Sequence, residues 1–237
     1  MIIDEKIHNS LNRFHFYSGI RFDTLPENEQ SIIFENSKLV SLEKKKVLFR
    51  QGSFPNGIYM LKKGMVKVYQ LNYDGSVQIL FIYSPCEVFG YRPILSNEYH
   101  PVTVAALDSC ELLFIDRNRF LEVLQKSVAL SNQLLFSLSH EFTVMTNRIN
   151  VFAQRGIKER LALALLILNE KFKNENNGTE IAEIKLPRTD LANFVGTSLE
   201  NLVRTLSFFK EKRLIRVKGK SIFIEHFENL YILSAID

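Results

Sequence analysis

Glu200 and Arg204 are the two residues whose types and spacing first suggest a specific chemistry. They stand four positions apart, so on a helix their side chains share one face. A carboxylate there can accept a hydrogen bond from N4 of cytosine, and a guanidinium can donate two hydrogen bonds to O6 and N7 of guanine. A purely structural role is also open, either as a salt bridge within the helix or as a capping box of Glu200 with Thr197. These two residues alone do not decide between DNA contact and a structural role.

The residues around this pair extend the candidate contact surface. Ser198 and Arg188 are placed to hold phosphate groups, which orient a protein on a duplex without reading its sequence. A basic band follows, opposed only by Glu211: Lys210, Lys212, Arg213, Arg216, Lys218 and Lys220. Such a run is usually only a solvated face, but this one lies beside the candidate reading helix, where phosphate contacts are needed. The predicted DNA-binding residues are Arg188, Ser198, Leu199, Glu200, Asn201, Arg204, Lys218 and Lys220.

The elements that must position these residues follow from local patterns. Two helical patterns, 188–194 and 198–211, are separated by Val195-Gly196-Thr197, and a β-hairpin over 214–224 follows them. This order predicts a winged helix-turn-helix whose second helix reads the major groove. Ahead of it the sequence predicts an apolar helix over 157–172, a polar loop over 174–178 and a strand over 181–186. The predicted buried face of the second helix carries Leu202, Leu206 and Phe209.

The region from Lys38 to Ile115 has a different pattern. Apolar and polar residues alternate over 65–71, and 77–83 is a second β-rich run, with the hairpin signal Asp74-Gly75 between them. Glycines recur at roughly regular intervals, at Gly52, Gly57, Gly64, Gly75 and Gly90. Many short strands with such punctuation predict a sandwich or a barrel-like roll.

A long helix is predicted between these two regions, over about 128–153, after a short helix over 117–126. Its apolar residues are spaced alternately three and four apart, as in the seam of a two-helix coiled coil. A helix packed only on its own domain would also fit. Gly156 interrupts the pattern and is a plausible hinge. The predicted dimer interface consists of Leu135, Leu138, Phe142, Met145, Ile149 and Phe152.

Together these patterns predict an α+β chain with three parts. A β-roll sensor domain is expected over 1–127, a dimerisation helix over 128–154 and a winged helix-turn-helix over 155–237. The composition, with 46% hydrophobic residues, 24% charged residues and a net charge of +4, is that of a globular protein. No apolar run reaches the roughly 18–20 residues that span a bilayer, and Met1–Asp23 lacks a signal-peptide core. We therefore expect a cytoplasmic protein without a membrane partner.

Two stretches resemble the cAMP receptor protein / fumarate–nitrate regulator (Crp/Fnr) family. The segment from Leu186 to Arg204, continued to Lys220, is similar to its helix-turn-helix. The second resemblance is to the cyclic-nucleotide-binding domain of the family, which is a double-stranded β-helix. It rests on Phe49–Gly52, Ile58–Gly64, Asp74-Gly75, Phe89-Gly90 and Ala105–Ile115. The resemblance implies a homodimer on double-stranded DNA, half-sites about one helical turn apart, and regulation of transcription through RNA polymerase.

The chain departs from the family pattern where cyclic nucleotides bind. Tyr91 stands where such members have a glutamate for the ribose, and His100-Pro101 stands where they have Arg-Ser or Arg-Thr for the phosphate. A histidine is only partly charged near neutral pH and a proline has no amide hydrogen. The phosphate site is therefore predicted to be lost, although Arg92 could compensate. The effector pocket is expected at Phe89, Gly90, Tyr91, Arg92, His100, Pro101 and Thr103.

No cofactor, metal or catalytic residue is predicted. Cys86 and Cys110 fit a reducing compartment and cannot alone build a metal site, and the five histidines show no ligand spacing. An enzyme on the roll is disfavoured because His-x-His, Gly-x-Ser-x-Gly and P-loop motifs are absent. Two hypotheses stand beside the DNA-binding regulator without a nucleotide. One is a cyclic-nucleotide-dependent regulator with a divergent pocket, and the second is an interaction module that does not bind DNA.

A second departure lies on the reading helix. Many family members begin it with Ser-Arg-Glu, and this chain has Ser198-Leu199-Glu200. Leu199 cannot hydrogen-bond guanine but can touch the methyl group of thymine. We therefore expect a half-site that keeps the base pair read by Glu200 and Arg204 and loses the guanine preference beside it.

Overall fold

The computed structural model describes residues 2–35, 37–175 and 182–236. The chain divides into two compact units. One unit is Tyr17–Glu141, and the other combines Met1–Phe16 with Phe142–Asp237. Within the described ranges, no helix is both long and apolar enough to cross a membrane.

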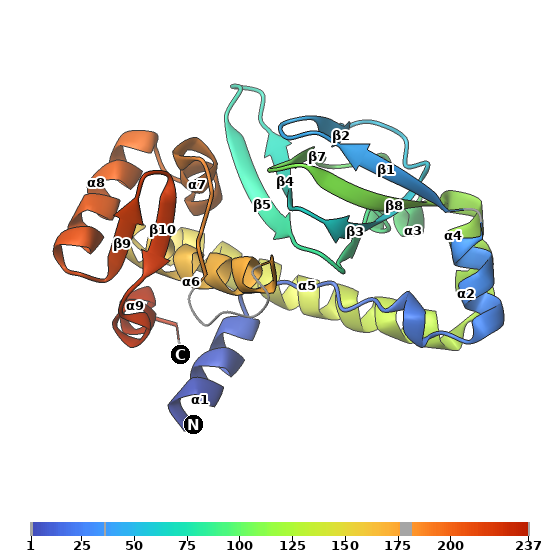
Figure 1. The fold of residues 1–237 in the computed structure, drawn as a ribbon, viewed down its shortest axis with the longest axis horizontal. Helices are drawn as coiled ribbons and strands as arrows, with labels where there is room; N and C mark the ends of the chain where they lie inside the picture. Colours follow the sequence, from blue (N-terminus) through green and yellow to red (C-terminus); the bar gives the residue numbers. More distant parts are fainter. Residues whose placement is uncertain (1, 36, 176–181, 237) are drawn as a thin grey trace. The chain divides into compact units, whose positions relative to one another are not determined.

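The unit Tyr17–Glu141 is built on two four-stranded antiparallel sheets (Figure 1). Their strand orders are β1-β8-β3-β6 and β2-β7-β4-β5. This arrangement confirms the predicted β-roll, which begins at Lys38 as expected. The strands are β1 (Lys38–Leu42), β2 (Val47–Phe49), β3 (Gly57–Lys63), β4 (Val66–Leu71), β5 (Val77–Tyr83), β6 (Val88–Phe89), β7 (Thr103–Ala106) and β8 (Cys110–Asp116).

Two of the roll's glycines are required for different physical reasons. Gly75 lies in the turn between β4 and β5 with φ +81°, a left-handed conformation that favours glycine, as the Asp-Gly signal predicts. Gly57 is not a turn residue. A Cβ atom at Gly57 would overlap the backbone oxygen of Ile115 and the ring of Phe114, so this position needs glycine for close strand packing.

Short helices accompany the strands in this unit. They are η1 (Phe22–Thr24), α2 (Glu27–Phe34), α3 (Arg92–Ser96) and α4 (Arg117–Lys126). The sequence predicted α4 correctly and did not predict η1 or α2. The Asp116 carboxylate caps α4 by accepting a hydrogen bond from the Asn118 amide at 2.8 Å. A buried apolar cluster joins strands and helices, including Ile33, Ile58, Ile115, Val123 and Leu130.

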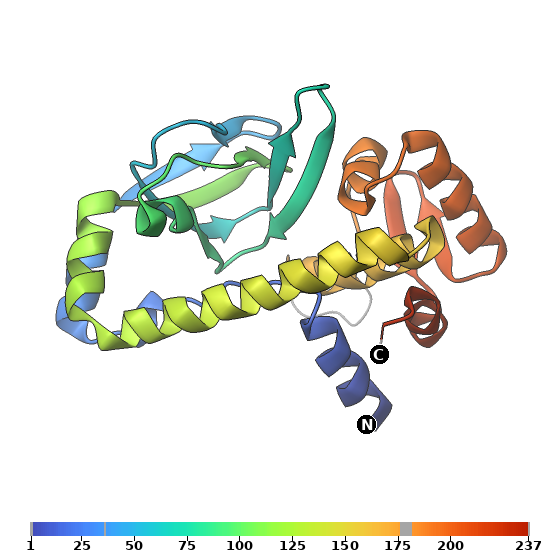
Figure 2. The same ribbon diagram turned by 180° about the vertical axis from the view of Figure 1, so that it is seen from behind.

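The long helix α5 (Val128–Gln154) confirms the predicted helix and runs without interruption (Figure 2). One stripe of this helix is buried against its own chain: Leu130, Leu134, Ser137, Glu141, Val144 and Arg148. A second stripe, the predicted seam, is largely exposed. The exposed fractions are 63% for Leu135, 75% for Phe142 and 65% for Ile149. The helix ends just before Gly156, where the sequence predicted an interruption.

The second unit contains the predicted winged helix-turn-helix. Its described elements are α1 (Ile2–Asn12), α6 (Ile157–Glu175), α7 (Arg188–Val195), α8 (Leu199–Glu211), β9 (Ile215–Lys218), β10 (Ser221–Ile224) and α9 (Phe227–Ser234). Helices α1 and α9 were not predicted. The core of this unit is apolar, with Leu165, Leu191, Leu202, Phe209 and Ile222 fully or almost fully buried.

Two predictions between α6 and α7 are wrong. Helix α6 continues to Glu175, so Asn174 is helical and does not begin a loop; residues 176–178 lie outside the described ranges. Residues 182–186 form no strand, because only Ile184 bridges to Ile222. The ladder does not extend, since the Ala182 amide donates instead to the Asn169 side chain at 3.4 Å. Ile181, where the strand was predicted to begin, lies outside the described ranges.

Candidate functional site

The turn between α7 and α8 is set by Gly196. This residue has φ +71° and ends α7 in a left-handed conformation, with its amide donating to the carbonyl of Ala192 at 2.9 Å. Leu202, Leu206 and Phe209 are buried as predicted, so the apolar face of α8 packs into its own unit. The opposite face of α8 is thereby left at the surface.

The beginning of α8 differs from the predicted capping box. Ser198 is the capping residue, and its Oγ accepts a hydrogen bond from the Asn201 amide at 3.2 Å. The helix therefore starts one residue later than a Thr197 cap would require. This shift places Asn201 at the third helical position, where Glu200 was expected, so the Thr197–Glu200 capping box is wrong. It also gives Ser198 a structural role before any ligand binds.

Glu200 instead pairs with Arg204. The Arg204 Nη2 donates to the Glu200 Oε1 at 2.7 Å, and the two side chains, Arg204 and Glu200, are 73% and 81% exposed. Ion pairs this exposed contribute little to stability, so either side chain is free to exchange its partner for another polar group.

Two apolar side chains share the exposed face of α8 with this pair. Leu199 is 45% exposed and Val203 is 48% exposed. The sequence singled out Leu199 and missed Val203, although the i,i+4 spacing from Leu199 was a usable signal. Asn201 is half-buried, and its backbone carbonyl accepts a hydrogen bond from the Thr205 hydroxyl at 2.8 Å.

Arg188 and the β-hairpin lie together. The Arg188 Nη1 donates to the backbone carbonyl of Lys220 at 3.2 Å, which ties the start of α7 to the turn between β9 and β10. Burial lowers the pKa of Arg188. Lys218 and Lys220 are exposed on either side of Gly219, which has φ +58°. The structure thus brings three of the predicted contact residues to one turn.

The predicted basic band is at the surface throughout. All six of its residues are exposed: Lys210, Lys212, Arg213, Arg216, Lys218 and Lys220. One opposing charge was missed, because Glu225 Oε1 forms an ion pair with Arg216 Nε at 3.3 Å. That pairing depends on the hairpin register and is not visible as a local charge pattern.

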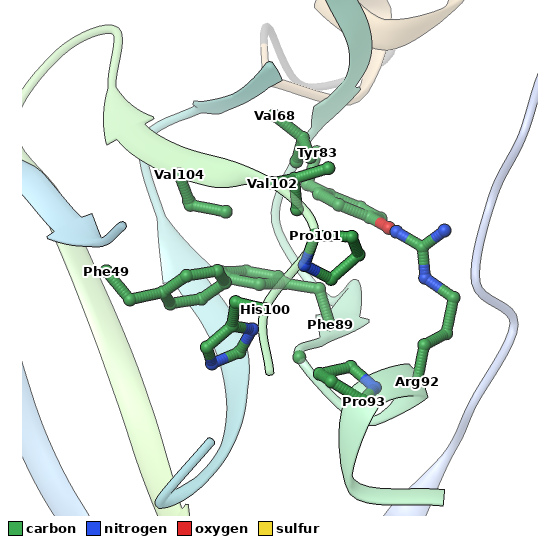
Figure 3. A pocket seen from close by; sticks show the side chains of 11 residues that line it. Phe49, Val68, Tyr83, Phe89, Arg92, Pro93, His100, Pro101, Val102 and Val104 are labelled. Atoms are coloured by element: carbon green, nitrogen blue, oxygen red, sulfur yellow. The ribbon is translucent and has the colours of Figure 1, made fainter. Parts of the chain in front are cut away.

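A second candidate site is a small pocket in the roll, with about 300 Å³ of empty space including the part open to solvent (Figure 3). Five of the residues predicted for the effector pocket line it: Phe89, Gly90, Arg92, His100 and Pro101. Tyr91 and Thr103 do not line it. Tyr91 is buried with its hydroxyl 3.1 Å from Ser137 Oγ, and the Thr103 hydroxyl accepts from the Gln51 amide at 3.0 Å.

Stacked rings fill much of the space around this pocket. The ring centroids of Phe49 and His100 are 3.8 Å apart, and those of Tyr83 and Phe89 are 5.0 Å apart. Figure 3 shows His100 against Phe49 and Pro101 beside them. Burial, and then the charge of Arg92, lowers the pKa of His100 to about 4. The imidazole is therefore neutral near pH 7 and brings no positive charge to the pocket.

Arg92 is the cation of the pocket, and Glu141 on α5 already neutralises it. The distance from Arg92 Nη1 to Glu141 Oε1 is 2.6 Å, and the Glu141 side chain is almost fully buried. Burial raises the pKa of the Glu141 carboxyl, an effect that Arg92 opposes. Figure 3 shows the guanidinium turned toward the hydroxyl end of Tyr83. Among the described residues, no group of three or more His, Cys, Asp or Glu side chains could hold a metal ion.

Comparison with known proteins agrees with this architecture. Residues 39–127 match the cyclic nucleotide-binding domain, and residues 159–232 match the Crp-like helix-turn-helix domain. The transcriptional activator protein Anr of Pseudomonas protegens is 26% identical over 183 residues, which cover 77% of this chain and 75% of the relative. The fumarate and nitrate reduction regulatory protein of Yersinia pestis is 26% identical over 189 residues, covering 80% and 75%.

A solved structure shares the fold. FixK2 from Bradyrhizobium japonicum superimposes with a TM-score of 0.77 at 20% identity, covering 85% of this chain and 98% of that one. A cyclic-nucleotide-binding-like roll, a long helix and a Crp-like helix-turn-helix define a class of DNA-binding transcription regulators. The chain belongs to the Crp/Fnr family of transcription regulators.

Proposed function

We propose that the chain is a sequence-specific regulator that binds DNA as a homodimer and does not use a cyclic nucleotide. The observation that carries the proposal is the exposed Glu200–Arg204 pair on α8, together with the exposed lysines of the β9–β10 hairpin, which is the wing. In this proposal residues 155–237 bind DNA, residues 128–154 form the dimer and residues 1–127 act as the sensor domain. A cytoplasmic location and contact with RNA polymerase are part of it, and catalysis is not.

On DNA, the proposed contacts divide into two kinds. Glu200 and Arg204 exchange their mutual ion pair for hydrogen bonds to cytosine and guanine edges in the major groove. Lys218 and Lys220 contact phosphates, as does Arg188, which the hydrogen bond to Lys220 holds beside the wing. Ser198 caps α8 and presents the positive end of the helix to a phosphate.

The exposed seam of α5 supports the proposed homodimer. Leu135, Phe142 and Ile149 are each more than 60% exposed on a helix whose other stripe is already buried in its own chain. Met145 is half-buried, Leu138 packs partly against the roll core, and Phe152 lies at the end of the seam. A second copy of the same seam would bury these residues by knobs-into-holes packing.

Loss of the cyclic-nucleotide site is supported by the chemistry of the pocket. A bound phosphate needs permanent charge and free amide donors. His100 is neutral, Pro101 has no amide hydrogen, and Arg92 is neutralised by Glu141. The aromatic stack also leaves little room for a purine ring. A non-nucleotide effector, or none, fits the site better.

The test is DNA binding by the Arg204→Ala variant of the full chain. On a duplex that the wild type binds specifically, losing a bidentate guanine contact should cost about 1–3 kcal/mol and relax specificity at that base pair. Arg119→Ala is a matched control, because Arg119 is also exposed and paired with a glutamate, at 3.0 Å, but lies on α4. Equal binding by wild type and Arg204→Ala would remove Arg204 as a reading residue. A folded wild type that binds no DNA duplex at all would favour an interaction module.

A further inference from the structure

Leu199 and Val203 form an apolar strip on the exposed face of α8. Among the described residues of α7, α8, β9 and β10, these two are the only large hydrophobic side chains that are strongly exposed. The fully buried apolar residues of α8, Leu202, Leu206 and Phe209, lie on its inner side. Nearly half of each of these two residues is open to solvent, so the strip is available to a partner.

The strip runs beside the Glu200–Arg204 pair. With about 100° of rotation per residue, Leu199 and Val203 lie about 40° apart around the helix, and Glu200 and Arg204 follow within the next 100° or so. All four side chains thus share one face. Ser207 lies between the two rows, and its hydroxyl donates back to the Val203 carbonyl at 3.1 Å. A duplex edge that reaches Arg204 therefore lies close to the apolar strip.

We infer that Leu199 and Val203 together read two thymine methyl groups in each half-site. This inference rests on the proposed DNA-binding function and specifies its ligand. The C5 methyl of thymine is the apolar group in the major groove, and neither side chain can hydrogen-bond a base. Four residues span about 6 Å along the helix, so the two methyl groups lie on base pairs within about two steps of each other. They adjoin the base pair that Arg204 reads.

Replacing thymine with uracil tests the inference, since it removes the methyl group and leaves Watson–Crick pairing intact. The experiment uses the full chain, a duplex selected by that chain, and uracil placed symmetrically at one thymine position at a time. We expect two sensitive positions per half-site, each weakening binding about fourfold per methyl group removed. The selected half-site must also contain thymines, on either strand, at both positions.

Variants assign each methyl group to its reader. Val203→Ala should weaken binding to the thymine duplex and become insensitive to uracil at one position, while staying sensitive at the other. Leu199→Ala should show the reverse. Both residues are nearly half exposed, so each substitution should lower the thermal unfolding midpoint by at most a few degrees. Ser207→Ala is the control on the same face, and it should keep both sensitivities.

Cytosine with and without a 5-methyl group separates recognition of the methyl from recognition of the base. A thymine-to-cytosine change should weaken binding, and 5-methylcytosine should recover part of the loss at both positions.

A selected motif whose affinity is unchanged by uracil at every position would overturn the inference while leaving the regulator intact. Uracil effects that persist unchanged in both alanine variants would also overturn it. A folded chain that binds no DNA duplex at all would instead count against the proposed function itself.

Discussion

Single buried residues decide the chemistry of the roll. His100 is only 4% exposed and stacks on Phe49, so its charged form loses hydration, and Arg92 adds repulsion. A site that binds an anionic phosphate needs a permanently charged donor. Here a neutral imidazole ring takes part in aromatic packing instead. His100 is therefore a structural residue whose effect on stability depends on pH.

That pH dependence gives a stability prediction. The folded-state pKa of His100 is about 4 and the unfolded value is about 6.5, so the unfolded chain binds more protons between these values. The stabilisation that comes from keeping His100 neutral is therefore complete above about pH 6.5 and is lost as the pH falls toward 4. Between pH 7 and pH 5, His100 should account for about 1–2 kcal/mol of lost stability. Urea titrations of wild type and His100→Phe should show a smaller loss for the variant, which keeps the stack. Parallel losses would contradict the assignment.

The Arg92–Glu141 pair gives a second prediction. Removing one partner of a buried pair leaves an uncompensated charge, so Glu141→Gln should lower the unfolding free energy by about 3 kcal/mol. Glu122→Gln, which breaks the exposed pairs with Arg119 and Lys126, should cost about 0.5 kcal/mol. Urea denaturation measures both changes. A double Arg92→Met, Glu141→Leu variant should recover most of the loss, and equal costs for the two glutamates would refute a buried role for Glu141.

At the scale of elements, the two stripes of α5 have different environments. The inner stripe packs on its own chain, and the outer stripe leaves Leu135, Phe142 and Ile149 in water. Exposed apolar rows of this length on a helix mark an interaction surface. The coiled-coil spacing of the outer row points to a second copy of the same helix.

Phe142→Asp should therefore convert the dimer to a monomer, because it would place a carboxylate in the middle of the apolar seam. Sedimentation equilibrium should show at least a tenfold weaker dimer, and binding to a two-fold DNA site should fall in parallel. Asn150→Asp is a matched control with the same new charge on an exposed position of α5 outside the seam. A Phe142→Asp chain that remains as dimeric as the control would show that the seam is not the interface.

Local patterns predicted the elements that the sequence encodes strongly. The glycine-punctuated strands, α4, α5 and the helices of the helix-turn-helix lie close to their predicted bounds. Helices α1, α2 and α9 were missed, although α4 and α7 are equally short and were predicted. Packing can stabilise a short helix that carries no strong local signal. The Thr197 cap was misplaced by one residue because Ser198 competes for the same role.

Long-range pairs could not be predicted from a single sequence. Arg92 and Glu141 are 49 positions apart, and Arg216 meets Glu225 only through the hairpin. Five of the residues predicted for the pocket do line it, because their positions follow the family pattern. Tyr91 instead points away from the pocket, toward Ser137 on α5. This orientation depends on how α5 packs on the strands, which no local sequence pattern indicates.

At the scale of the whole molecule, α5 is the element that both compact units share. We proposed that no cyclic nucleotide regulates DNA binding through this helix, and this can be measured directly. Titration calorimetry with cAMP or cGMP up to about 1 mM should show no saturable heat, and neither compound should change DNA affinity. Saturable binding of either nucleotide that also changes DNA affinity would instead establish a cyclic-nucleotide-dependent regulator with a divergent pocket.

Selection of DNA from a random pool by purified, ligand-free full-length protein, at a fixed salt concentration, tests effector-independent sequence recognition in a single experiment. We expect a palindromic motif with half-sites about one helical turn apart. Each half-site should contain the G·C pair read by Arg204 and Glu200, with thymines beside it in place of the guanine preference. Folded, dimeric protein that enriches no motif would contradict effector-independent recognition by α8.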